Sequence, residues 1–189
     1  RPLIACQVRQ GGHRRWVCAE RELKRQGYHV GRADGRVGPH SVWAIYAFEK
    51  VARRKVRGTF TNGDWRKMVR RPRYKVRRPG LPDDHVEINI ARQLIVLVRN
   101  GKARYFAHTS TGKPSTPTVR GTFSVYEKRP YYQPWNDMYK AIFFYRGYAM
   151  HGYPKVPTYP ASHGCARTYN RNQDWLYPKI SYGERVAVY

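Results

Sequence analysis

The spacing of apolar residues in the first third of the chain is typical of helices. A first set recurs at helical intervals up to Gly27, and a second continues to about Arg53. A third, short helix is expected after Asn62-Gly63, with Asp64 as its N-cap residue. The stripe of the first helix consists of Trp16, Val17, Glu20, Leu23 and Lys24. The buried face of the second consists of Val42, Ile45, Tyr46 and Phe48, and the third contains Trp65, Met68 and Val69.

After Asp83 the apolar period changes to two. Val86, Ile88 and Ile90 alternate with polar residues, and 94–98 is a continuous apolar run suited to a buried strand. Further strands are expected at 103–108, 122–127, 141–145, 148–151 and 186–189, with one helix at 172–177. The predicted fold class is therefore α+β, in which a small three-helix domain precedes a mostly antiparallel, sandwich-like β domain.

A basic, proline-rich segment separates the two patterns. Residues 70–82, RRPRYKVRRPGLP, contain three prolines and many like charges, so the segment is not a helix interior. We expect an extended linker that packs poorly. The expected domains are 1–69 and 83–189, with 70–82 between them. The alternative, a basic arm for nucleic acid, would interleave aromatics with the charge, and only Tyr74 does so.

The formal net charge of +25 over 189 residues is extreme. A polyanionic neighbour, such as an anionic wall polymer, a membrane surface or nucleic acid, is one explanation. Solubility of an exposed, Arg-rich protein is the other. No apolar run approaches the length of about 18 residues that a transmembrane helix needs.

The three cysteines fall into two groups. Cys6 and Cys18 lie close together, and Cys165 stands alone. A disulfide between the first two would imply an oxidising compartment. The alternative is a pair of small buried residues. Either way Cys165 is left as an unpaired thiol.

The stretch from Tyr148 to Tyr169 carries the candidate chemistry. It contains His151-Gly152, a proline-rich loop and then Ser162-His163-Gly164-Cys165-Ala166-Arg167. A nucleophilic thiol needs a base for its proton, a positive environment and backbone N–H donors for the oxyanion. This stretch offers all three. A zinc site of His151, His163 and Cys165 is the alternative, but a fourth ligand at metal spacing is missing.

This second domain resembles the L,D-transpeptidase catalytic domain. The resemblance is carried by QLIVL at 93–97, TSTGK at 109–113, TPT at 116–118, GTF at 121–123, the His-Gly pair, the SHGCxR box and GERVAV at 183–188. The first 69 residues resemble a three-helix peptidoglycan-binding module, on Leu23, Gly27-Tyr28, Gly31, Asp34-Gly35, Val37-Gly38, Ala44, Phe48 and Trp65. They depart from it at 56–60 and at Glu49.

The resemblance implies a role for each residue of the box. Cys165 would attack a diaminopimelate carbonyl of a stem peptide and form a thioester, with His151 as base and the Gly152 carbonyl orienting its ring. The N–H groups of Gly164 and Cys165 would hold the oxyanion. The basic surroundings are expected to lower the thiol pKa below about 8.5.

Several assignments stay open at this point. Arg167 would either bind a substrate carboxylate or brace the loop, and Tyr148 is a further candidate for substrate contact. His163 is expected to support the loop, with exchange of roles with His151 as the alternative, and Ser162 to cap backbone groups. The segment 109–120 is either a plain connection or a lip over the site.

The resemblance also implies a cellular role. It predicts an exported, wall-associated enzyme that cross-links or remodels peptidoglycan, its partner, without a cofactor, a metal or nucleic acid. Alternatives are an L,D-carboxypeptidase, a lipoprotein-attaching enzyme, or a basic wall- or nucleic-acid-binding protein whose box is inert.

Overall fold

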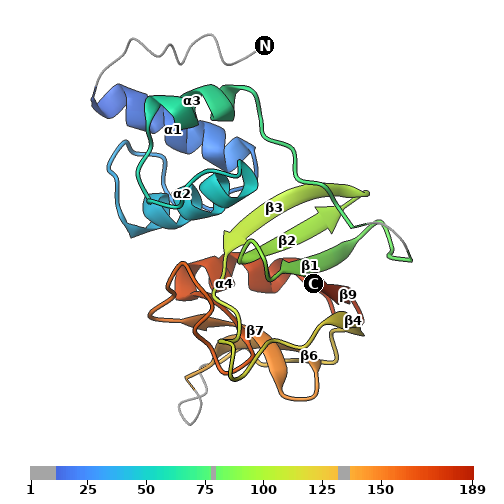
Figure 1. Ribbon diagram of the computed structural model, residues 1–189. Coiled ribbons are helices and arrows are strands. Elements are labelled where there is room, and N and C mark those ends of the chain that lie inside the picture. Colours follow the sequence, from blue (N-terminus) through green and yellow to red (C-terminus); the bar gives the residue numbers. More distant parts are fainter. Residues whose placement is uncertain (1–11, 78–79, 132–136) are drawn as a thin grey trace. The chain divides into compact units, whose positions relative to one another are not determined.

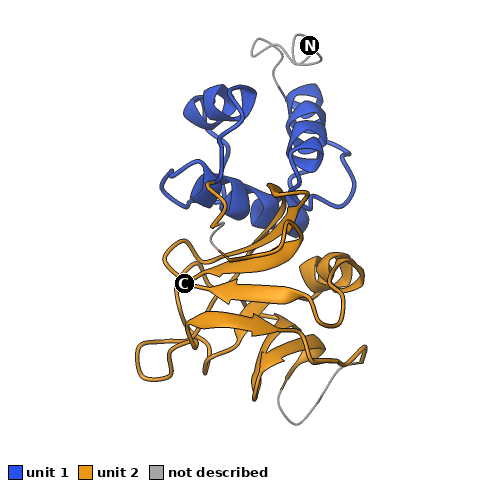
Figure 2. Ribbon diagram, turned by 90° about the vertical axis from the view of Figure 1, so that its right-hand side faces the viewer, with its two compact units in different colours: residues 1–74 blue, residues 75–189 orange. Residues whose placement is uncertain are grey.

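The computed structural model describes residues 12–77, 80–131 and 137–189. The chain divides into two compact units, 1–74 and 75–189 (Figure 2). The division falls inside the segment expected to be a linker. That segment does not simply lie extended in solvent, because the Arg77 N–H donates to the buried Glu87 carboxylate at 2.5 Å within the second unit.

The first unit contains three helices, α1 (His13–Arg25), α2 (Pro39–Val51) and α3 (Asn62–Val69) (Figure 1). Their apolar faces meet around Leu23, Phe48 and Met68, which are fully buried. The expected stripe is confirmed at Leu23 but is wrong at Lys24, which is exposed. No helix among the described residues is long and apolar enough to cross a membrane.

Two buried glutamates hold the turns of this unit. Glu20 accepts hydrogen bonds from the Gly35 N–H at 2.8 Å and the Ser41 hydroxyl at 2.6 Å. Glu49 accepts the N–H groups of Arg57 and Gly58 at 2.9 and 3.0 Å. Backbone and hydroxyl donors replace water at both oxygens of Glu20 but at only one oxygen of Glu49, and burial raises the pKa of Glu49.

The N-cap of α3 differs from the expectation. Thr61 is the N-cap residue, and Asp64 occupies the N3 position of a reciprocal capping box. The Thr61 side chain accepts the Asp64 N–H at 3.3 Å, while the Asp64 carboxylate accepts the Thr61 N–H at 2.8 Å. Assigning Asp64 as the cap was wrong because Asn62-Gly63 already belongs to the first helical turn.

The second unit contains two mixed β-sheets, which confirms the α+β class. One sheet has the strand order β3-β2-β1-β9-β4 and the other β5-β6-β7-β8. The strands are β1 (His85–Asn89), β2 (Leu94–Arg99), β3 (Lys102–His108), β4 (Gly121–Ser124), β5 (Glu127–Lys128), β6 (Tyr139–Tyr145), β7 (Tyr148–Tyr153), β8 (Ala166–Tyr169) and β9 (Arg185–Val188). Two of the pairings, β1 with β9 and β7 with β8, are parallel.

The core of this unit lies between the two sheets. It includes Ile88 and Leu97 of one sheet, Ile142 and Met150 of the other, and Leu176 of helix α4 (Asn170–Leu176). Helix α4 packs on β6, β7 and β8 and is followed by a 3-10 turn, Tyr177–Lys179. Leu176 thus joins the core that covers the sheet carrying the His-Gly pair.

Strand β8 was not anticipated from the sequence. Its four residues, Ala-Arg-Thr-Tyr, have no apolar alternation, and it pairs in parallel with β7 rather than through a hairpin. This pairing is what brings the SHGCxR box beside His151.

Candidate active site

His151 is held in β7 with its ring orientation fixed. The side chain is buried, and its Nδ1 atom lies 2.9 Å from the Gly152 carbonyl oxygen. A carbonyl only accepts, so Nδ1 carries the proton and Nε2 has the free lone pair. The expected contact between His151 and Gly152 is present.

Burial keeps this histidine uncharged. It lowers the pKa of His151 from 6.5 to about 4, and the nearby Arg167 guanidinium acts in the same direction. The Gly152 carbonyl partly opposes both effects because it accepts the ring proton. Near neutral pH the imidazole is therefore a proton acceptor.

Cys165 lies immediately before β8. The β7–β8 register pairs His151 with Arg167, two residues beyond the cysteine. The thiol is free, half-buried, and packed against a cluster that includes Phe143 and Ala149. Its Sγ donates to the Gly147 carbonyl at 3.8 Å.

The expected lowering of the thiol pKa is wrong. Burial raises the pKa of Cys165 above its ordinary value of 9.0, although Arg167 and a backbone hydrogen bond at Ala149 lower it. The net basic charge of the protein lies in water, where it acts weakly, whereas desolvation acts directly on the sulfur. The resting site therefore pairs a neutral thiol with a neutral imidazole.

Ser162 organises the turn that leads to the thiol. Its hydroxyl donates to the Cys165 carbonyl at 2.5 Å and accepts the Gly164 N–H at 3.1 Å. The serine thus caps backbone groups, as expected, and His163 between them is exposed. The assignment of the Gly164 N–H to an oxyanion is wrong because the serine already occupies that donor. Of the two N–H groups proposed, that of Cys165 remains.

Two glycines allow close packing around the site. Gly164 has a φ of 124°, and a Cβ there would lie 2.8 Å from the Tyr148 ring. A Cβ on Gly152 would lie 2.7 Å from the Asn170 Oδ1 atom and 2.8 Å from Tyr139. Tyr148 therefore forms one wall of the cysteine turn.

The segment 109–118 braces the turn from the other side. The Thr118 hydroxyl donates to the Gly164 carbonyl at 2.7 Å, and the Lys113 N–H donates to the Ser162 carbonyl at 3.0 Å. Ser110 and Arg167 exchange two backbone hydrogen bonds, both of 2.9 Å. The segment is more than a plain connection, and sequence reasoning did not assign these contacts although it noted the motifs.

Arg167 lies over an aromatic ring that also neighbours His151. Its guanidinium carbon is 4.1 Å from the centre of the Tyr153 ring, and the same ring lies 6.1 Å from the His151 ring. Its Nε is buried and has no hydrogen-bond partner among the described residues. Sequence reasoning missed Tyr153. Its place two residues after His151 on the same strand was the available signal.

The structure bears on the predicted disulfide and on the alternative of a zinc site. Cys18 is disulfide-bonded, but Cys6 lies outside the described residues, so the pairing of the two stays a prediction. Within the described ranges, no group of three His, Cys, Asp or Glu side chains is arranged to hold a metal ion.

Comparison with known families decides the relationship. Residues 83–188, more than half of the chain, match the YkuD family model, which describes the L,D-transpeptidase catalytic domain. The chain belongs to the L,D-transpeptidase family. This confirms the resemblance inferred from the motifs of the second domain. No curated protein matches the chain.

Solved structures of L,D-transpeptidases share the fold. A fragment of the Xylanimonas cellulosilytica enzyme is 28% identical, with a TM-score of 0.84 over 92% of each chain. An L,D-transpeptidase from Stackebrandtia nassauensis is 18% identical, with a TM-score of 0.58 over 97% of this chain and 95% of its own. One from Mycobacterium smegmatis is 24% identical, with a TM-score of 0.51 over 57% and 58%. The first match includes the helical unit.

Proposed function

We propose that this protein is a cysteine-dependent L,D-transpeptidase that acts on peptidoglycan stem peptides. The observation that carries the proposal is the hydrogen bond of 2.9 Å between His151 Nδ1 and the Gly152 carbonyl. Because Nδ1 is engaged, the free lone pair of the neutral imidazole is on Nε2, and the β7–β8 pairing sets His151 alongside the strand that directly follows the free thiol of Cys165. A structural histidine would not need a neighbouring cysteine held on a braced turn.

The first step transfers the thiol proton as the sulfur attacks. Because the thiol and the imidazole are both neutral, His151 Nε2 takes the proton while the sulfur bonds to the diaminopimelate carbonyl carbon. The oxyanion then forms beside the Cys165 N–H. Its collapse breaks the C–N bond, and the imidazolium returns the proton to the leaving D-alanine amine. A thioester on Cys165 remains.

Arg167 is assigned to a carboxylate of the substrate. Its guanidinium lowers both the thiol pKa and the His151 pKa, so it favours the thiolate but opposes the imidazolium. A substrate carboxylate at Arg167 would offset the second effect at the moment the proton moves. Tyr153, under the guanidinium, and Tyr148, beside Gly164, are the positioning and substrate-contacting candidates.

The acceptor determines the product. An amine of a second stem peptide resolves the thioester as a cross-link, whereas water gives a tripeptide and makes the enzyme an L,D-carboxypeptidase. Incubation with disaccharide tetrapeptides, followed by mass analysis, separates the two. Dimers support the transpeptidase; tripeptides alone support the carboxypeptidase. If neither dimers nor tripeptides form, the proposal is overturned.

The helical unit is proposed to bind peptidoglycan outside the cytoplasm. Its three helices and two glutamate-held turns support a compact module, and the disulfide at Cys18 fits an oxidising compartment. Co-sedimentation of the full chain with purified sacculi tests this. If the helical unit binds peptidoglycan, Cys165→Ala protein should still sediment with the sacculi, whereas variants of the Asp34-Gly35 turn should stay in solution. Equal sedimentation of the turn variants would contradict it.

A further inference from the structure

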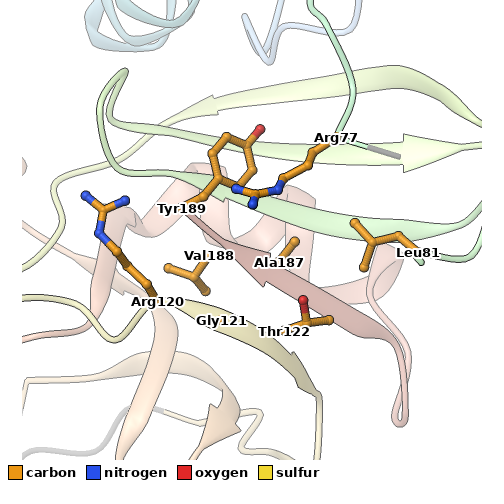
Figure 3. A pocket seen from close by; sticks show the side chains of 8 residues that line it. All are labelled: Arg77, Leu81, Arg120, Gly121, Thr122, Ala187, Val188 and Tyr189. Carbon is orange, nitrogen blue, oxygen red and sulfur yellow. The ribbon is translucent and has the colours of Figure 1, made fainter. Parts of the chain in front are cut away.

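A concave site lies at the five-stranded sheet of the second unit. It has a volume of about 570 Å³ and lies where Arg77 and Leu81 face the start of β4 and the end of β9 (Figure 3). The remaining lining residues are Arg120, Gly121, Thr122, Ala187, Val188 and Tyr189. None of them belongs to the cysteine site, and no lining residue is acidic.

Arg77 is held in place by a buried carboxylate. Glu87 is fully buried and accepts the Arg77 N–H at 2.5 Å and the Tyr189 hydroxyl at 2.6 Å. The Arg77 guanidinium carbon in turn lies 4.9 Å from the centre of the Tyr189 ring. Glu87 therefore fixes both the backbone of the arginine and the ring on which its side chain rests.

Arg120 supplies a second guanidinium from a different element. It precedes β4, which is the edge strand of the five-stranded sheet. In Figure 3 the side chains of Arg120 and Arg77 enter the view from separate segments, with Val188 and Tyr189 between them. Neither guanidinium has an ion-pair partner within the described part of the chain.

We propose that this pocket binds phosphate groups of a polymer of linked phosphates. A carboxylate presents two oxygens in one plane, which a single guanidinium fork satisfies. A phosphate group is tetrahedral, so its oxygens can accept hydrogen bonds from guanidinium groups that approach from different directions. A volume of about 570 Å³ also exceeds what one small ion needs, which favours a ligand with several such groups.

The proposal does not depend on catalysis by Cys165. The protein carries a net charge of +25, which would concentrate a polyanion near its surface, and the pocket would give it a defined position. Repeated phosphates strengthen a weak individual contact by raising the effective concentration of the next group. The pocket would thus anchor the enzyme to an anionic polymer beside its substrate.

The test uses a small probe and a local readout. The full chain is titrated with tripolyphosphate, and the amide NMR shifts of Gly121 and Thr122 are followed. Arg77→Gln combined with Arg120→Gln removes both forks. The matched control, Lys102→Gln with Arg104→Gln, removes the same charge from exposed positions on β3, at the opposite edge of the same sheet.

We expect saturable shifts in the wild type and about tenfold weaker binding in the double pocket variant, since each exposed charge pair contributes up to about fivefold. The control should change affinity by less than about twofold. Citrate, which carries carboxylates, should bind more weakly than tripolyphosphate.

Three results would overturn the proposal: shifts that do not saturate, equal weakening in the control variant, or citrate binding as tightly as tripolyphosphate. Thioester formation on Cys165 is measured separately, so the two proposals can fail independently.

Discussion

The protonation of His151 should set the acid stability of the second unit. Its pKa is lowered from 6.5 to about 4 by burial, so the unfolded chain binds more protons than the folded one between these values. Stability is therefore full above pH 6.5 and falls as the pH decreases toward 4. Each pKa unit corresponds to about 1.4 kcal/mol, so the loss between pH 7 and pH 4 is about 3 kcal/mol.

The perturbation that isolates this effect is His151→Asn. Asparagine can still donate to the Gly152 carbonyl but does not titrate. Urea unfolding is followed at several pH values, using the transition of the second unit, and the variant is compared with the wild type. Subtraction removes the contributions of other titrating groups. His163→Asn serves as the control, because that side chain is exposed and should retain the wild-type dependence.

The free energy of unfolding of the variant, measured relative to that of the wild type, should increase by about 3 kcal/mol between pH 7 and pH 4. A change below about 1 kcal/mol would refute the claim that burial keeps His151 neutral. It would also remove the argument that the resting site contains a neutral thiol and a neutral imidazole, since a charged imidazolium would then be compatible with the fold.

Three further predictions concern the surroundings of the thiol. Alkylation of Cys165 by iodoacetamide should increase with pH through a pKa above 9.0. Arg167→Gln should raise that pKa further, because it removes the positive charge that lowers the thiol pKa. An unchanged pH profile in this variant would contradict the role of the guanidinium. Gly152→Ala places a Cβ 2.7 Å from the Asn170 Oδ1 atom of α4 and should lower the free energy of unfolding by about 1–3 kcal/mol, as measured by urea unfolding. In the control, Gly147→Ala, the added Cβ enters open space and should lower it by less than about 0.5 kcal/mol. Thr118→Val removes the hydroxyl that braces the cysteine turn and should reduce kcat about tenfold with little change in the thiol pKa. Unaltered turnover would contradict this role of the hydroxyl.

The sequence was informative wherever local chemistry decides the structure. Apolar periodicity located the three helices and most strands, since one buried face per element leaves a visible pattern. The His-Gly pair and the SHGCxR box located the site. These features need only neighbours along the chain.

What the sequence did not reveal depends on contacts between distant segments. Strand β8 forms because β7 lies beside it, and its own residues do not show a strand pattern. Glu87 is a polar residue that alternates with apolar ones, yet it is buried because Arg77 and Tyr189 satisfy its oxygens.

The charge state of the site follows the same rule. Positive residues near Cys165 in the sequence suggested a lowered thiol pKa, but burial by Phe143 and Ala149 outweighs them. The donor assignment for Gly164 failed because the hydroxyl that occupies its N–H can be identified only once the turn is folded.

The most direct test of the account is the intact mass of the protein after incubation with a disaccharide tetrapeptide. We predict an adduct on Cys165 with the mass of the donor less its terminal D-alanine, and neither adduct nor turnover in Cys165→Ala protein that keeps the wild-type circular dichroism spectrum. Turnover that persists in Cys165→Ala would contradict the assignment of the nucleophile.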